Sequence, residues 1–169
     1  SFLIMNLTAH IEPEGSGSLL LRGQSLHNFP DQLFTGKLWN LQDLLLPDNQ
    51  ICNIPTTLNR LYYLTKLDLT NNQIHLIEQS AFHGLRQLSV LKLGQNKIND
   101  MKPFLTMTNL RALYLSNNNI KTIPPEIAQL SSLKILHLNQ NKIKTIPSTI
   151  GKLQSLISLH LAQNEISVL

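Results

Sequence analysis

Hydrophobic and polar residues alternate along this chain in a phrase that returns at a nearly constant spacing. The phrase reads Leu-x-x-Leu-x-Leu-x-x-Asn-x-Ile and is written six times, with intervals of 22 to 24 residues between successive copies. Its asparagines are Asn49, Asn72, Asn96, Asn118, Asn141 and Asn164. A period of this length predicts a solenoid, in which each unit buries its apolar side against the next unit.

Within each phrase, the alternation of apolar and other residues predicts a short strand. In one copy, Leu113 and Leu115 alternate with Ala112, Tyr114 and Ser116. We expect the leucines to face the core and the residues between them to face outward. Parallel stacking of such strands, about 4.8 Å apart, would build one continuous sheet.

The asparagine at the end of each strand has a predicted structural role. We expect its side chain to turn inward and to hydrogen-bond backbone groups of the turn and of the next repeat. Six such residues would form a buried amide ladder. Loss of one member would leave buried backbone groups unsatisfied, at about 1–3 kcal/mol.

The segment after the asparagine predicts the return path of each repeat. Pro55, Pro124 and Pro147 each follow an isoleucine, and proline ends the extension of a strand because it lacks a backbone donor. Apolar residues then recur at every third position in 127–133 and 150–156. This spacing predicts a short helix or 3₁₀ turn with one buried side.

These elements predict an α/β fold, a right-handed solenoid of about seven repeats shaped like a horseshoe. A parallel β-sheet would line its concave face, and short helices, 3₁₀ turns or loops its convex face. A degenerate first repeat around Gln24 brings the repeat domain to residues 16–169, with the last repeat truncated at Leu169. Residues 1–15 are predicted to form an N-terminal cap.

Residues 17–169 resemble the leucine-rich repeat superfamily. The phrase at 123–133 and 146–156 resembles intracellular Ras-associated and plant-type repeats, whereas 79–88 resembles the repeat of extracellular receptors. Such mixtures occur in bacterial and protist members, including effectors delivered into host cells. The resemblance implies a non-catalytic module that binds a protein partner on its concave face, as an adaptor, an effector or the targeting arm of a larger protein.

Outward positions on neighbouring strands form columns, and these columns supply the candidate binding residues. One column contains Tyr114, His137 and His160, with Ile135 beside it. Tyr and His combine an apolar body with a polar tip, which suits a protein interface. The alternative is that the rings stabilise the sheet as cross-strand pairs. The other candidates are Asp43, Lys66, Asp68, Lys92 and Asn139.

Composition narrows the possible partners. The net charge is +4, and a basic stripe of Lys97, Lys121, Lys142 and Lys144 follows the asparagines. Without interleaved aromatic residues to stack on bases, this stripe does not predict nucleic-acid binding. The sequence has no run of eighteen apolar residues, so we expect no transmembrane segment.

The sequence contains no motif that predicts catalysis, a cofactor or a metal site. His137 and His160 are two potential ligands without an evident third. Cys52 is the only cysteine, which favours a reducing, cytoplasmic compartment (host cytoplasm for an effector) over an extracellular, disulfide-capped receptor. We expect a monomer. The alternative functions are a structural element that self-associates through its uncapped C-terminal end and an extracellular ligand-sensing domain.

Overall fold

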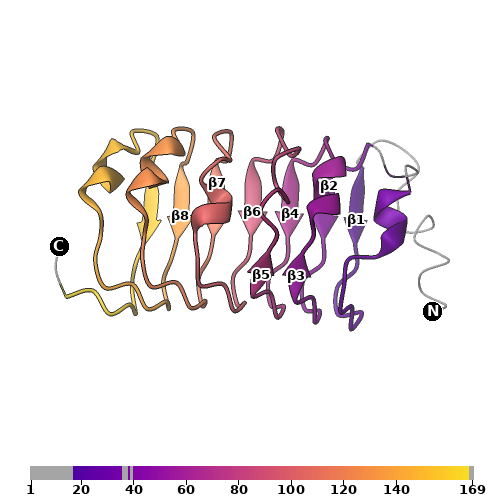
Figure 1. Cartoon of the computed structure of the whole chain (residues 1–169), viewed down its shortest axis with the longest axis horizontal. Coiled ribbons are helices and arrows are strands. Elements are labelled where there is room, and N and C mark those ends of the chain that lie inside the picture. The colour runs from indigo at the N-terminus through magenta and orange to yellow at the C-terminus, as the bar shows by residue number, and fades with distance from the viewer. Residues whose placement is uncertain (1–16, 36–37, 39, 168–169) are drawn as a thin grey trace.

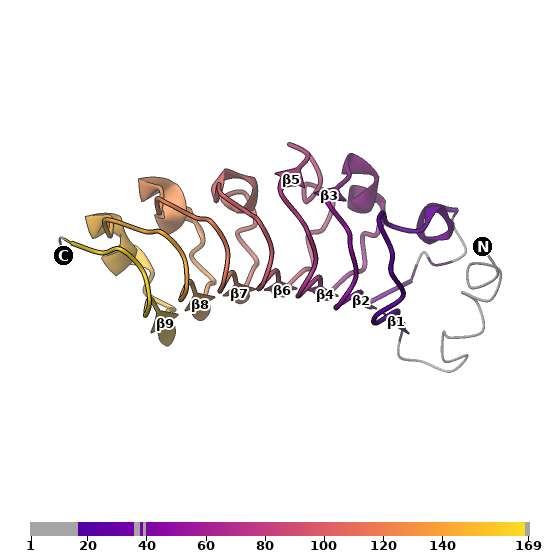
Figure 2. The ribbon, with the colours of Figure 1, turned by 90° about the horizontal axis from the view of Figure 1, so that it is seen from below.

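The protein is a curved solenoid, seen in a computed structural model that describes residues 17–35, 38 and 40–167 (Figures 1 and 2). Seven strands form one parallel sheet in the order β1-β2-β4-β6-β7-β8-β9. They are β1 (Ser18–Leu20), β2 (Asp43–Leu45), β4 (Lys66–Asp68), β6 (Val90–Lys92), β7 (Ala112–Tyr114), β8 (Ile135–His137) and β9 (Ser158–His160). The predicted leucine-rich solenoid with a concave parallel sheet is confirmed.

The middle residue of every strand is a leucine, and the strand register places these leucines side by side. Leu113 pairs with Leu91 on one side and with Leu136 on the other. All three are fully buried, whereas their strand neighbours face the concave surface. The core is therefore a stack of leucine and isoleucine layers, as the alternation predicted.

Each asparagine of the phrase bonds backbone groups of its own turn and of the preceding repeat. Asn118 donates from Nδ2 to the carbonyl oxygens of Leu93 (2.9 Å) and Leu115 (3.1 Å) and accepts from the amide of Ile98 (2.9 Å). Leu93 directly follows β6, and its backbone amide donates a hydrogen bond to the carbonyl oxygen of Tyr114 in the next repeat. The side-chain amide of Asn118 therefore supplies a hydrogen-bond donor to the carbonyl oxygen of Leu93, just past the end of the strand.

The prediction that these asparagines bond the next repeat was therefore wrong in direction. The same arrangement holds at both ends of the row. Asn49 accepts hydrogen bonds from the amides of Gln24 and Leu26, and Asn164 accepts one from the amide of Ile143. Each repeat is thus sealed by the asparagine of its C-terminal neighbour.

The residue before each of these asparagines adopts a left-handed backbone conformation. Its φ is 58° at Asp48 and 57° at Asn117, and the residues before the other four asparagines match. Gly23 has the same conformation before Gln24, which places Gln24 in register with the later asparagines. Asn and Asp tolerate this region better than most residues, and they fill three of the six positions before the asparagines, with glutamine at the other three.

The convex side carries 3₁₀ helices, as predicted, and no α-helix among the residues that the structure describes. They are η2 (Asp31–Phe34), η3 (Thr56–Arg60), η4 (Lys102–Phe104), η5 (Pro125–Gln129) and η6 (Ser148–Lys152). Pro55, Pro124 and Pro147 lie in extended conformation immediately before η3, η5 and η6. Proline therefore marks the change from the extended segment to the turn.

A second sheet, which the sequence did not predict, lies on the convex side. Strands β3 (Asn53–Ile54) and β5 (Leu76–Ile77) pair in parallel. Glu78, just after β5, accepts hydrogen bonds from the backbone amide (2.7 Å) and the hydroxyl of Thr56. These bonds lower the pKa of Glu78, and they tie the two repeats together at the start of η3.

Two expectations fall on residues without a described placement. The N-terminal cap predicted for residues 1–15 and the truncation at Leu169 lie outside the described residues. In the part of the chain that is described, no helix is long and apolar enough to cross a membrane.

Candidate functional site

The centre of the C-terminal part of the concave face is a continuous column of rings. Tyr114 and His137 meet edge to face, with ring centroids 5.0 Å apart and planes at 88°. His137 and His160 stack in parallel, with centroids 3.9 Å apart and planes at 7°. The column continues to β6, where the ammonium group of Lys92 lies 5.7 Å from the centre of the Tyr114 ring.

The register of the sheet explains why these side chains meet. Lys92 pairs with Tyr114, Tyr114 with His137, and His137 with His160. Outward residues of paired parallel strands stand about 4.8 Å apart, which is also the distance at which rings make contact. The predicted column is thus one contiguous surface, and its role in binding stays a prediction.

Stacking decides which parts of the rings remain free. One face of His137 is covered by His160, and Tyr114 lies at right angles to His137. The Nε2 atom of His137 lies 3.2 Å from the hydroxyl oxygen of Ser158. Because burial and then the neighbouring charge of His160 disfavour its protonated form, the pKa of His137 is lowered. The column therefore offers ring edges and polar tips to a partner.

The polar candidates at the flanks of this column are partly ordered by contacts with each other. Asn139, just after β8, accepts a hydrogen bond of 2.6 Å from the hydroxyl of Ser116. Ile135 is half-buried on the concave side of β8 and pairs with Ala112 and Ser158 in the register. Small neighbours leave Ile135 accessible beside the rings.

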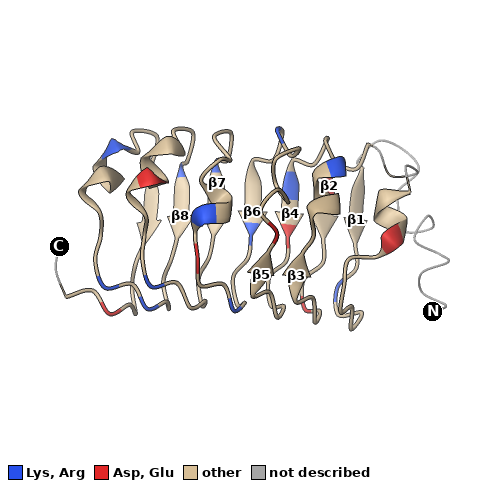
Figure 3. Ribbon diagram, viewed as in Figure 1, with Lys and Arg blue, Asp and Glu red and all other residues tan. Residues whose placement is uncertain are grey.

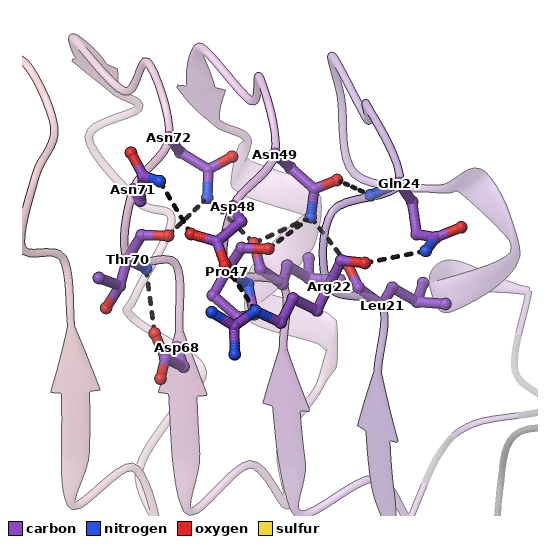
Figure 4. A network of polar contacts seen from close by, with 11 residues as sticks. Leu21, Arg22, Gln24, Pro47, Asp48, Asn49, Asp68, Thr70, Asn71 and Asn72 are labelled. Carbon is purple, nitrogen blue, oxygen red and sulfur yellow. Dashed lines mark hydrogen bonds and ion pairs between the residues drawn. The ribbon is translucent and has the colours of Figure 1, made fainter.

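The N-terminal part of the concave face holds the other charged candidates in a different arrangement. Arg22 forms an ion pair of 2.6 Å with Asp48, and Asn71 donates to the other oxygen of that carboxylate (Figure 4). Both hydrogen bonds lower the pKa of Asp48. The carboxylate of Asp48 is therefore already satisfied within the protein.

The remaining carboxylates of this region also have donors. Asp68 accepts from the amide of Thr70 (3.0 Å) and lies 3.8 Å from the ammonium group of Lys92. Asp43 accepts from the hydroxyl of Thr65 (3.2 Å). Lys66 pairs with Asp43 in the strand register and lies next to it on the same surface. The structure thus brings these four candidates together on β2, β4 and β6, and Lys92 joins them to the ring column.

Charge is distributed unevenly along the solenoid (Figure 3). The sequence from residue 89 onward contains nine Lys and Arg against three Asp and Glu, whereas the part before it contains five against seven. The three carboxylates after residue 89 are Asp100, Glu126 and Glu165, and none occupies an outward strand position. The ring column therefore lies in a region without a neighbouring carboxylate on its strands.

Two further basic residues of this region were not predicted as candidates from the sequence. Arg111 and Lys134 are exposed and come immediately before β7 and β8. The carbonyl of Arg111 accepts from the amides of Lys134 and Ile135, so the two basic residues are neighbours at the edge of the sheet. Their spacing of one repeat was the signal that could have identified them.

No group of three His, Cys, Asp or Glu within the described ranges could hold a metal ion, and Cys52 is free and half-buried. Its thiol lies 3.8 Å from the carbonyl oxygen of His27. The concave surface presents donors, rings and amides in the open, which suits recognition.

A surface hollow on the convex side was not predicted. It has a volume of about 530 Å³ and is lined by Phe82, His83, Arg86, Met107 and Asn109 among others. It lies beside the repeat between Asn96 and Asn118, which is the shortest of the series at 22 residues. The hollow is lined by residues of two adjacent return segments, so neither segment alone could have predicted it.

Comparisons with known proteins agree with this architecture. Residues 74–168 match the family described as "Leucine-rich repeat region", and residues 63–75 match "Leucine Rich repeat". The chain therefore belongs to the leucine-rich repeat family, as the resemblance implied. Proteins of this family generally bind other proteins through such repeats.

Relatives and solved structures come from different branches of life. The chain is 38% identical over 96 residues to the volume-regulated anion channel subunit LRRC8D of Rattus norvegicus, covering 56% of this chain and 11% of that protein. An internalin of Listeria monocytogenes superposes with a TM-score of 0.73 at 27% identity, covering 84% of this chain and 40% of that one.

A plant peptide hormone receptor, RGFR1, solved in complex with RGF2, superposes with a TM-score of 0.68 at 31% identity. The match covers 86% of this chain and 23% of the receptor chain. The chain thus spans a minor part of each of these proteins, and their activities belong to those proteins as wholes.

Proposed function

We propose that this chain is a non-catalytic recognition module that binds a protein partner on the C-terminal part of its concave face. The observation that carries the proposal is the contiguous column of Tyr114, His137 and His160. Binding energy at protein interfaces concentrates in a few such amphipathic residues near the centre of the contact. The sheet here also holds them in fixed positions, so little conformational freedom is lost on binding.

The size of the surface supports a specific complex. Seven strands about 4.8 Å apart span roughly 30 Å, which is wide enough for the roughly 800 Å² that each partner of a standard complex buries. The predicted polar residues Asp43, Lys66, Asp68, Lys92 and Asn139 would form the rim around the rings. Rim residues guide orientation and association more than they add affinity.

The test compares two double variants in a pull-down followed by mass spectrometry. Tyr114→Ala with His137→Ala removes the column, whereas Tyr62→Ala with His83→Ala removes an exposed tyrosine and an exposed histidine outside the concave sheet. We expect proteins captured by the wild type and the control to be lost with the first variant. Equal capture by all three proteins, at unchanged melting temperature, would contradict the placement.

Within this proposal, the module serves as an adaptor, an effector or the targeting arm of a larger protein in a reducing compartment. Support comes from the free thiol of Cys52, since this sequence has no second cysteine to pair with it. Expression with compartment-specific tags would test the location. Recovery from an oxidising compartment alone would contradict it.

A second candidate function is self-association through the edge strand β9. Leu159 is 36% exposed, although its register partner Leu136 is fully buried, and Ile157 beside it is 81% exposed. An exposed apolar strand edge is a template for pairing with another chain. Light scattering against concentration would show a rise in mass, and Ile157→Lys would abolish it. A constant monomer mass up to high concentration would exclude this candidate.

A further inference from the structure

We infer that the partner segment held by the C-terminal part of the concave face is acidic, with carboxylates directed at the strip formed by Lys92, Arg111, Lys134, His137 and His160. The inference rests on the proposed function and adds the chemistry of the partner to it. We call these five residues the basic strip.

The basic strip has one counter-charge within the described residues of the protein, at its N-terminal end. The two ion pairs found in the described part of the chain are Arg22–Asp48 and Lys92–Asp68. Only the second involves the strip, at 3.8 Å and at its N-terminal end. Carboxylates of the N-terminal part are satisfied by donors of the protein itself, whereas Arg111 and Lys134 stand exposed at the sheet edge. A partner with the opposite charge would fit this field.

The residues that surround His137 and His160 also favour an acidic partner. Tyr114 and Ala112 face it from β7, Ile135 and Asn139 from its own strand and turn, and Ser158 from β9. None of them carries a negative charge. Lys92 adds a positive charge across Tyr114. A carboxylate from outside would be the first anion near either imidazole.

Ring stacking favours an acidic protein segment over a nucleic acid. Nucleic-acid bases bind aromatic platforms by stacking on free ring faces. Here His160 covers one face of His137 at 3.9 Å, and Tyr114 meets His137 edge to face. The stacked rings therefore present fewer free faces than an open aromatic platform, and imidazole N–H groups and the Tyr114 hydroxyl can donate hydrogen bonds to carboxylates. Protonation of either histidine would strengthen such bonds.

The experiment measures fluorescence anisotropy of a labelled hexaglutamate peptide with the full chain, at low salt, at pH 7.5 and pH 5.5. A labelled hexaglutamine peptide reports binding without charge. An oligothymidylate of six nucleotides represents nucleic acid. We expect hexaglutamate to bind more tightly than both other probes, and more tightly at pH 5.5 than at pH 7.5, because acid favours the charged form of an imidazole.

Matched charge variants separate a site from general attraction. Lys92→Gln with Lys134→Gln and His137→Gln removes charge from the basic strip. Lys97→Gln with Lys142→Gln and Lys144→Gln removes charge from exposed turns elsewhere. We expect the first variant to bind hexaglutamate about tenfold more weakly and the second to change it little.

The inference is overturned if both variants lose affinity equally, if hexaglutamine binds as well as hexaglutamate, or if the oligothymidylate binds most tightly. None of these results would touch the proposed function, which depends on the Tyr114 and His137 pull-down. If the Tyr114/His137 variant lost its partner in the pull-down while any of these three peptide results was found, the concave face would bind a partner that is not acidic.

Discussion

The two halves of the concave face share one backbone and differ in their surface chemistry. Strands β2 and β4 carry the carboxylates Asp43 and Asp68, which accept hydrogen bonds from the protein itself, and Asp48 after β2 is held by both Arg22 and Asn71. Strands β7, β8 and β9 carry rings packed on each other and no carboxylate in an outward position. The carboxylates on this side of the first half have donors within the protein, whereas the second half leaves positive charge exposed.

This difference separates what maintains the fold from what is free to specialise. Inward residues are similar in both halves, with buried leucines such as Leu67 and Leu136, and an asparagine follows each of the six concave strands after β1. Outward residues vary more along the sheet than inward residues do, because they do not fill the core between repeats. Changes at inward positions should therefore act equally in both halves, and changes at outward positions should act locally.

The largest expected effect is the loss of a ladder asparagine. Asn72→Ala in the first half and Asn118→Ala in the second each orphan buried backbone groups, for Asn118 the carbonyls of Leu93 and Leu115 and the amide of Ile98. We expect each change to lower the free energy of unfolding by on the order of 3 kcal/mol. Urea denaturation followed by circular dichroism measures this. A large difference between the stability losses of the two variants would contradict the expectation that the interior is equivalent in both halves.

Gly84→Ala should have the next largest effect, on the convex side of the first half. A Cβ at this position would lie 2.0 Å from the carbonyl oxygen of Asn59 in the preceding repeat. The backbone must shift, which we expect to cost about 2 kcal/mol of unfolding free energy. The control is Gly151→Ala in the second half, where nothing lies within 4 Å of the added atom. A similar melting temperature for both variants would contradict this packing difference.

A smaller effect is the acid sensitivity of the second half. The pKa of His137 is lowered in the folded protein by burial and by His160, so the unfolded chain binds this proton more readily. Stability from this residue is complete above the ordinary histidine pKa and is lost as the pH falls through the lowered value. Unfolding free energies between pH 7.5 and pH 5 should decline, and His137→Gln should reduce that decline. If the unfolding free energy of the His137→Gln variant declined as steeply with falling pH as that of the wild type, the prediction would be contradicted.

The smallest effect concerns the first half at lower pH. Asn71 and Arg22 lower the pKa of Asp48 in the folded state. Its stabilisation is present above the unfolded pKa of an aspartate, near 4, and disappears as the pH falls through the lowered folded value. Comparing Asp48→Asn with the wild type from pH 5 to pH 2.5 tests this. The effect is small because the carboxylate is exposed, and a wild-type curve parallel to that of the variant would refute it.

Much of the fold could be predicted from local patterns. The phrase from Leu110 to Ile120 specified a strand, its inward face and the turn that follows it. Because every copy repeats the phrase, the register of neighbouring strands followed as well, and with it the column of Tyr114, His137 and His160. Periodicity converts a one-dimensional pattern into neighbours in space.

Features that depend on neighbouring repeats could not be predicted in this way. The direction of the asparagine hydrogen bonds depends on stacking, because Asn118 reaches the carbonyl of Leu93 in the repeat before it. The pairing of β3 with β5 and the convex hollow near His83 each involve residues of two adjacent repeats. No single repeat contains this information.

The sequence by itself determined the period, the inward leucines and the order of residues on the concave face, since each follows from alternation within one short segment. Only the tertiary structure decided how the rings pack, which carboxylates are already satisfied and which basic residues stand unpaired at the sheet edge. These properties depend on distances of a few ångströms between side chains of different repeats. Such distances are set when the layers stack and not within any one of them.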